Sequence, residues 1–151
     1  MALRIHKSGF TLIELMVVVI IMMALLGLTL VNYSSFNDSQ KVKQTAMTLK
    51  SDLQMARASA TSGKKPAACD GELFEGYEVS FTATTYSIAP KCSTVGVISA
   101  EKIDVTLPSG ISFSPTPSTF LYYPLIRGMS ATTPSVTVTD GENTATVNLY
   151  E

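Results

Sequence analysis

The chain has 151 residues, with 11 basic side chains, 12 acidic side chains and a formal net charge of −1. This length predicts one domain, and the lack of a basic excess argues against a general nucleic-acid-binding surface. The one histidine, His6, excludes histidine-based metal clusters and serine–histidine catalysis.

The first predicted element is an apolar run, residues 10–31, in which Glu14 is the one charged side chain. As an α-helix, this run would span about 33 Å, which is enough for the hydrocarbon core of a bilayer. The preceding residues, 1–9, contain Arg4 and Lys7 and no acid. Because basic flanks stay on the cytoplasmic side of a membrane, we expect the rest of the chain to lie outside the cytoplasm.

Three interpretations of this apolar run compete. A secretory signal peptide would be cut after the run, but residues 32–36 show no clear A-x-A cleavage pattern. A plain membrane anchor fits the length but leaves Glu14 unexplained, because an ionised carboxylate in hydrocarbon is costly. A cut between Gly9 and Phe10 needs no cleavage pattern after the run. It also accounts for Glu14, since it creates an amine about one helical turn from this carboxylate.

The stretch KSGFTLIELMVVVII resembles the class III signal of type IV pilins and type II secretion pseudopilins. This resemblance implies that prepilin peptidase removes a leader, residues 1–9, by cutting after Gly9, and then methylates the new N-terminal residue, Phe10. It also identifies Glu14 with the family's glutamate at the fifth mature position. We expect this carboxylate to pair with the Phe10 ammonium of a neighbouring subunit and so to set axial register. The alternative is neutralisation of Glu14 within its own chain.

Helical periodicity continues through residues 32–63, which we predict to be an amphipathic extension of the same helix. The apolar residues of this segment recur at steps of three and four, at Val42, Ala46, Leu49, Leu53, Ala56 and Ala60. Gly63 and Pro66 then end the pattern, so we predict a helix from about residue 11 to about residue 61. We expect Leu49 and Leu53 to pack against the domain's own sheet.

Residues 64–151 predict an extracytoplasmic, β-rich pilin head. After a linker-like stretch, 64–75, six or seven short strands are expected in the segments GYEVSFTA, TYSIAP, KIDVTLP, ISFSP, TFLYYPLI, SVTVT and TATVNLY. A long helix followed by strands indicates an α+β fold, with the amphipathic helix packed on an antiparallel sheet. The layout is similar to that of a minor pseudopilin of the GspH/FimT type.

The two cysteines, Cys69 and Cys92, enclose 22 residues. An extracytoplasmic location permits a disulfide between them, whereas two free buried thiols would suit a cytosolic domain better. A metal site is disfavoured because further thiol or imidazole ligands are missing. We favour the disulfide, which would contribute about 2 to 4 kcal/mol to stability.

A calcium site near the C-terminus is a minor alternative. Major pseudopilins of secretion systems often carry a calcium loop there, and the segment TDGEN supplies Asp140, Glu142 and Asn143. Calcium needs six to eight oxygen ligands, and a hairpin turn at Asp140–Gly141 explains these residues more simply. We therefore expect no metal and no cofactor.

A basic patch is the second minor alternative. The residues that would form it near the base of the head are Lys41, Lys43, Lys64 and Lys65. Some minor pilins that resemble this chain bind DNA during uptake, but a solvated helix face explains the lysines more simply. We do not expect DNA binding.

These patterns predict a structural subunit of a type II secretion pseudopilus or a type IV pilus, and we favour a minor subunit. The alternatives are a major type IV pilin and a minor competence pilin that contacts DNA. The expected partners are other pilins or pseudopilins, prepilin peptidase and the inner-membrane assembly platform. We expect a single-pass protein of the bacterial inner membrane that later enters the filament. No nucleophile–base pair, phosphate loop or convergent carboxylate pair is visible, so we expect no enzymatic activity.

Overall fold

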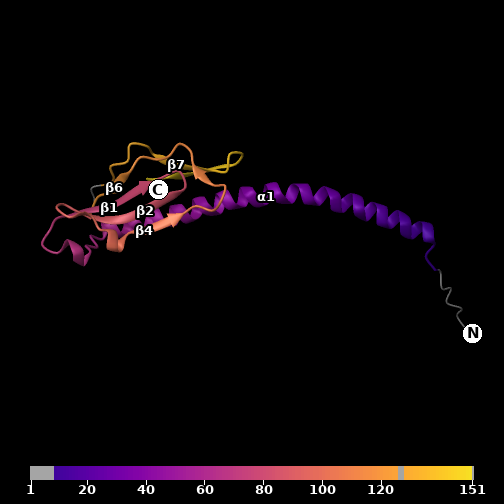
Figure 1. The fold of residues 1–151 in the computed structure, drawn as a ribbon, viewed down its shortest axis with the longest axis horizontal. Helices are drawn as coiled ribbons and strands as arrows, with labels where there is room; N and C mark the ends of the chain where they lie inside the picture. The colour runs from indigo at the N-terminus through magenta and orange to yellow at the C-terminus, as the bar shows by residue number, and fades with distance from the viewer. Residues whose placement is uncertain (1–8, 126–127, 151) are drawn as a thin grey trace, which may run out of the picture. The chain divides into compact units, whose positions relative to one another are not determined.

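The computed structural model describes residues 9–125 and 128–150, and it describes the backbone but not the side chains of residues 28–35. Most of the predicted leader, residues 1–8, lies outside the described residues. The chain divides into an N-terminal unit, Met1–Asn37, and a second unit, Asp38–Glu151, which we call the head. Helix α1 contributes residues to both units (Figure 1).

Helix α1 extends from Leu12 to Thr61, close to the bounds that the sequence predicts. The apolar run and the amphipathic segment contain no proline, so no backbone donor is missing along the helix. The helix ends in a Schellman motif. The Gly63 N–H donates to the Ala60 carbonyl at 2.9 Å, and the Lys64 N–H donates to the Ser59 carbonyl at 3.1 Å. Gly63 has a φ of +63°, which a glycine adopts without a side-chain clash.

In the head, the apolar stripe of α1 forms one side of the core. The six residues predicted for this stripe are all buried, and Leu49 and Ala60 are 0% exposed. They belong to the same core cluster as Val79, Phe120 and Val138 from the strands. This confirms that Leu49 and Leu53 pack against the sheets of their own chain.

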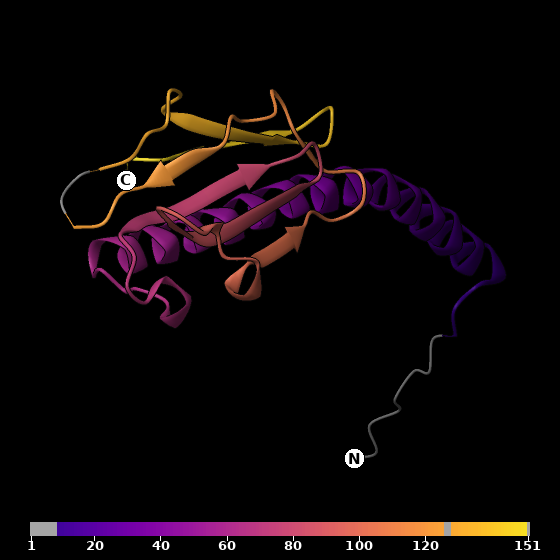
Figure 2. The same cartoon turned by 60° about the vertical axis from the view of Figure 1, so that its left-hand side comes forward.

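The larger sheet has five strands in the head. Its order is β3 (Gly96–Val97), β2 (Thr85–Cys92), β1 (Phe74–Phe81) and β6 (Phe120–Tyr122), and β4 (Ile103–Thr106) also pairs with β2. All these pairings are antiparallel. Within the head, strands β1 and β2 lie along the C-terminal part of α1 (Figures 1 and 2).

The smaller sheet has three antiparallel strands in the order β5 (Ser112–Phe113), β7 (Ser135–Thr139) and β8 (Thr144–Asn148). Val136, Val138 and Val147 point into the shared core, while the alternating threonines stay at the surface. Thr139 and Thr144 close the β7–β8 hairpin that the DGEN sequence predicts. The fold is therefore α+β, as expected.

The sequence-based prediction of the strands differs from the structure in two places. Eight strands form within the described residues, against six or seven expected, because β3 was not predicted. The two residues of β3 pair with Lys91 and Cys92 of β2. A strand of two residues shows no hydrophobic alternation, so its formation depends on the neighbouring strand. The predicted linker at 64–75 also contains a short 3₁₀-helix, Ala67–Cys69, and the first two residues of β1.

Candidate functional site

The predicted cleavage point lies just before α1. Gly9 and Phe10 lie in the segment without regular secondary structure that precedes Leu12, and both residues are exposed. Phe10 is 80% exposed, and no heavy atom outside the adjoining residues comes within 4 Å of a Cβ built on Gly9. A peptide bond outside the helix and free of packing is accessible to a peptidase, because no helical hydrogen bond has to open before cleavage.

Glu14 takes part in a capping box at the start of α1. Its Oε2 accepts from the backbone N–H and the hydroxyl of Thr11, both at 3.5 Å, and the Glu14 N–H donates to the Thr11 hydroxyl at 3.4 Å. Thr11 is thus the N-cap residue and Glu14 the third helical residue, the standard spacing of this motif. The geometry gives Glu14 a partner in its own chain.

Sequence reasoning missed the role of Thr11. The signal was present in the sequence, because a threonine followed three residues later by a glutamate, just before an apolar run, is typical of a capping box.

The N-terminal part of α1 exposes its apolar side chains. From Phe10 to Leu26, the large apolar side chains are between 40% exposed, at Val19, and 80% exposed, at Phe10. Continuous apolar surface of this kind is typical of segments that other molecules cover. Within the described residues, no helix has the combination of length and apolar character needed to cross a membrane. Residues 28–31 of the predicted span are described by their backbone alone.

The comparison with known families concerns this same segment. Residues 4–30 match the family model of the prokaryotic N-terminal methylation motif. The motif supports a type IV pilin-like or pseudopilin subunit, and it implies processing by prepilin peptidase and assembly with other pilins. No curated protein and no solved structure gives a significant match to the chain. The motif ends before the head, so the likeness to GspH/FimT-type subunits stays a prediction.

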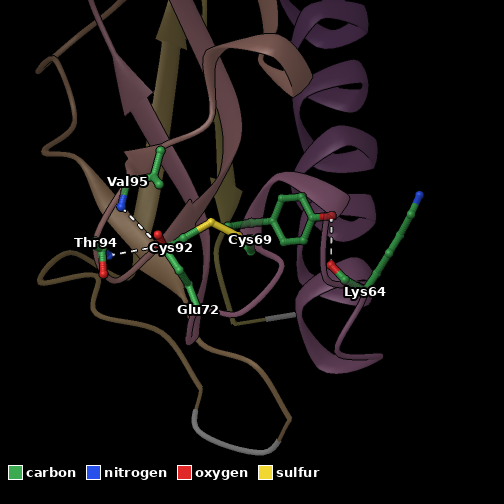
Figure 3. Close-up of a disulfide and its surroundings, with 7 residues drawn as sticks. Lys64, Cys69, Glu72, Cys92, Thr94 and Val95 are labelled. Carbon is green, nitrogen blue, oxygen red and sulfur yellow. Dashed lines mark hydrogen bonds between the residues drawn. A yellow bond between two sulfur atoms is a disulfide. The ribbon is translucent and has the colours of Figure 1, made fainter.

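Cys69 and Cys92 form the disulfide that the sequence favours (Figure 3). Both residues are 0% exposed, their Cα atoms are 5.7 Å apart, and Phe74 and Ile98 pack around them. The bond joins the 3₁₀-helix after α1 to the end of β2. It therefore closes the loop that leaves the helix.

Hydrogen bonds of Glu72 and Tyr77 connect the loops around the disulfide. The Glu72 carboxylate accepts from the backbone N–H groups of Thr94 and Val95, both at 3.1 Å (Figure 3). The Tyr77 hydroxyl donates to the Lys64 carbonyl at 3.3 Å. Neither role was predicted, because each bond joins residues more than ten positions apart in the sequence.

Another unpredicted contact lies between α1 and β2. The Tyr86 hydroxyl donates to Asp52 Oδ2 at 2.5 Å, and Tyr86 is 2% exposed. The pKa of Tyr86 is raised well above its ordinary value. Burial of the hydroxyl is the larger cause, and the hydrogen bond to Asp52 is the smaller one. This bond gives a buried hydroxyl its partner and links the helix to the larger sheet.

The turn between β7 and β8 uses the oxygens that a calcium ion would need. Asp140 Oδ1 accepts from the backbone N–H groups of Glu142, at 2.9 Å, and Asn143, at 2.6 Å. Asp140 Oδ2 accepts from the Asn143 side-chain amide at 3.0 Å. These bonds support the hairpin-turn interpretation. In the part of the chain that is described, no group of three or more histidine, cysteine or acidic residues is arranged to hold a metal.

The four lysines of the alternative basic patch lie in two separate pairs. Lys41 and Lys43 lie near the start of the head's helical segment, and Lys41 pairs with Asp38 at 2.9 Å. Lys64 and Lys65 follow the end of the same helix. A helix rises 1.5 Å per residue, so about 30 Å separate the two pairs. The four lysines therefore do not form one contiguous patch.

Proposed function

We propose that this protein is a structural subunit, and a minor one, of a type II secretion pseudopilus or a type IV pilus. The match of residues 4–30 to the N-terminal methylation motif carries this proposal. In it, prepilin peptidase cuts between Gly9 and Phe10 and methylates the Phe10 amine. The placement of this bond before the first helical residue, Leu12, supports the cleavage step, because the bond is not held in the helix.

The apolar helix, residues 10–31, has two successive roles in this proposal. It first anchors the precursor in the inner membrane, with Arg4 and Lys7 on the cytoplasmic side and the head outside. The assembly platform then transfers the subunit into the filament, where helices of other subunits cover the exposed apolar side chains. The disulfide supports a head outside the cytoplasm, because disulfides persist in oxidising compartments.

Glu14 changes partners during assembly in this proposal. In the precursor, its carboxylate is held by Thr11, as the capping box shows. After cleavage, the ammonium of Phe10 on a neighbouring subunit takes the carboxylate, because a pair of opposite full charges is stronger than the 3.5 Å capping bonds from the neutral donors of Thr11. The resulting pair sets the axial register of the incoming subunit.

The mass of the N-terminal peptide of the protein isolated from its native membrane tests the processing step. We expect a peptide that begins at a methylated Phe10. A Gly9→Val variant is expected to keep its leader, while Gly27→Val, a glycine in the exposed apolar helix, is the matched control and is expected to be cut normally. An intact leader in the wild type, or a cut near Ser35, would overturn the proposal.

Incorporation of variants into sheared filaments tests the role of Glu14. We expect Glu14→Leu to be cut and methylated but to incorporate poorly, and Thr11→Ala to incorporate close to the wild-type level. If capping were the whole role of Glu14, both variants would lose incorporation equally, and Thr11→Ser would restore it. Normal incorporation of Glu14→Leu would sink the intersubunit pair.

The abundance of the subunit in sheared filaments tests whether it is minor. A minor subunit is expected to be rare relative to the main filament protein. If this chain formed most of the filament mass, the alternative of a major pilin would replace the proposal.

A further inference from the structure

The larger sheet carries a groove on the face that points away from the core. Side chains alternate across a strand, so Glu78, Lys91 and Leu121 lie opposite the buried faces of β1, β2 and β6. The groove has a volume of about 710 Å³, within the range of sites that hold ligands. Leu73 and Leu125 also line it.

The floor of the groove is charged and acidic in balance. Lys91 Nζ lies 3.1 Å from Glu78 Oε2 and 3.8 Å from Glu75 Oε2. The Glu78 side chain is 23% exposed and the Lys91 side chain 34% exposed. One cation faces two carboxylates, so the described lining carries a net charge of −1. The hydrogen bond from Lys91 to Glu78 raises the pKa of Lys91, which keeps the cation charged.

Two exposed leucines line the groove together with these charges. Leu73 is 73% exposed and Leu125 is 65% exposed, although both lie in a head that buries most of its large apolar side chains. The backbone of each leucine is hydrogen-bonded to another part of the head. The Leu73 carbonyl accepts from Ser93 N–H at 3.0 Å beside the disulfide, and Leu125 N–H donates to the Ala60 carbonyl at 3.3 Å.

Leu125 has an unusual backbone conformation. Its φ is +62°, a left-handed conformation that costs a leucine about 1 kcal/mol. The chain therefore holds a large apolar side chain towards solvent at an energetic cost. Such strain points to a function when the surroundings fix the residue.

We propose that this groove binds an extended polypeptide segment that presents a lysine or arginine between two apolar side chains. The basic group would enter the acidic floor and the apolar side chains would cover Leu73 and Leu125. The negative floor repels nucleic-acid phosphates, and the open groove with exposed leucines suits an interface better than an enclosed small-molecule site. This inference goes beyond the filament role and does not rest on it.

The test measures fluorescence anisotropy of labelled pentapeptides with the full-length protein in detergent micelles. The probe is acetyl-Leu-Ser-Arg-Ser-Leu-amide. Two matched peptides carry glutamate in place of arginine, or serine in place of both leucines, and empty micelles give the background. We expect saturable, salt-sensitive binding of the arginine peptide alone.

Three variants assign the binding to this groove. Glu78→Gln and Leu73→Ser are each expected to weaken binding about fivefold. Asp104→Asn is the control, because Asp104 pairs with Lys102 at 2.8 Å and does not line the groove. We expect it to leave binding unchanged. Melting curves of the head check that each variant is folded.

Several results would overturn the proposal. They are a lack of saturable binding, equal binding of the arginine and glutamate peptides, or an equal loss from Asp104→Asn. Self-association of the full chain that Glu78→Gln abolishes would instead assign the groove to a second copy of this chain. Cleavage at Gly9–Phe10 is measured separately, so failure of the filament proposal leaves these results interpretable.

Discussion

Helix α1 contains two regions that share a local structure and differ in what covers them. In the N-terminal unit, Leu15 is 60% exposed, and the neighbouring apolar side chains are exposed as well. In the head, Leu49 on the same helix is 0% exposed, because strands of both sheets lie over it. Burial of apolar area is the main stabilising contribution to folding. The head therefore contains the apolar partner of its part of α1, whereas the large apolar side chains from Phe10 to Leu26 are 40% to 80% exposed.

Matched leucine substitutions test this comparison most strongly. Leu49→Ala is expected to lower the free energy of unfolding of the head by about 4 kcal/mol, because it leaves a cavity in a fixed core. Leu15→Ala is expected to change it by less than about 0.5 kcal/mol. Urea unfolding of the full chain in detergent, followed by tyrosine fluorescence, measures both. Equal effects would show that the two regions share one core.

Loss of the disulfide is expected to have the next largest effect. The double variant Cys69→Ala/Cys92→Ala should lower the free energy of unfolding of the head by about 3 kcal/mol, because the unfolded chain gains entropy. Dithiothreitol should destabilise the wild type by a similar amount and leave the double variant unchanged. A reductant effect on the double variant would point to another cause.

Gly76→Ala tests the contact between β1 and β6. A Cβ at this position would clash with the Tyr122 carbonyl oxygen, and the φ of Gly76 is +139°. We expect the head to lose about 2 to 3 kcal/mol in stability, from both the clash and the backbone strain. Gly110→Ala is the control, since its φ is +83° with open space around it, and it should cost about 1 kcal/mol. Equal costs would contradict the close approach.

The smallest expected effect is the pH dependence of the β7–β8 turn. The hydrogen bond from Asn143 N–H, followed by other bonds within the turn, lowers the pKa of Asp140 below its ordinary value. The carboxylate therefore stabilises the turn above the unfolded pKa of about 3.9, and this contribution is lost as the pH falls through the folded pKa.

The amide chemical shifts of Glu142 and Asn143 measure this titration. We expect them to change only below about pH 4 and to become independent of pH in Asp140→Asn. A midpoint above the ordinary aspartate range would show that the hydrogen bonds do not favour the charged form.

Local patterns predicted much of this molecule. The period of the apolar residues located α1 and its buried stripe, and Gly63 marked its end. Each of the seven strand segments overlaps an observed strand. The prediction failed where a partner far away in sequence decides the outcome, as with β3, which forms because β2 lies beside it.

The sequence by itself determined the methylation signal around Gly9 and Phe10, because the motif is a contiguous string. It also favoured the Cys69–Cys92 disulfide, from the predicted location of the head, and it determined the α+β order of elements, which follows from the hydrophobic period. Only the tertiary structure brought Glu75, Glu78, Lys91, Leu73 and Leu125 into one groove. Their juxtaposition depends on the pairing of β1 with β2 and β6 and on the packing of the loops, and long-range pairing leaves no period in the sequence.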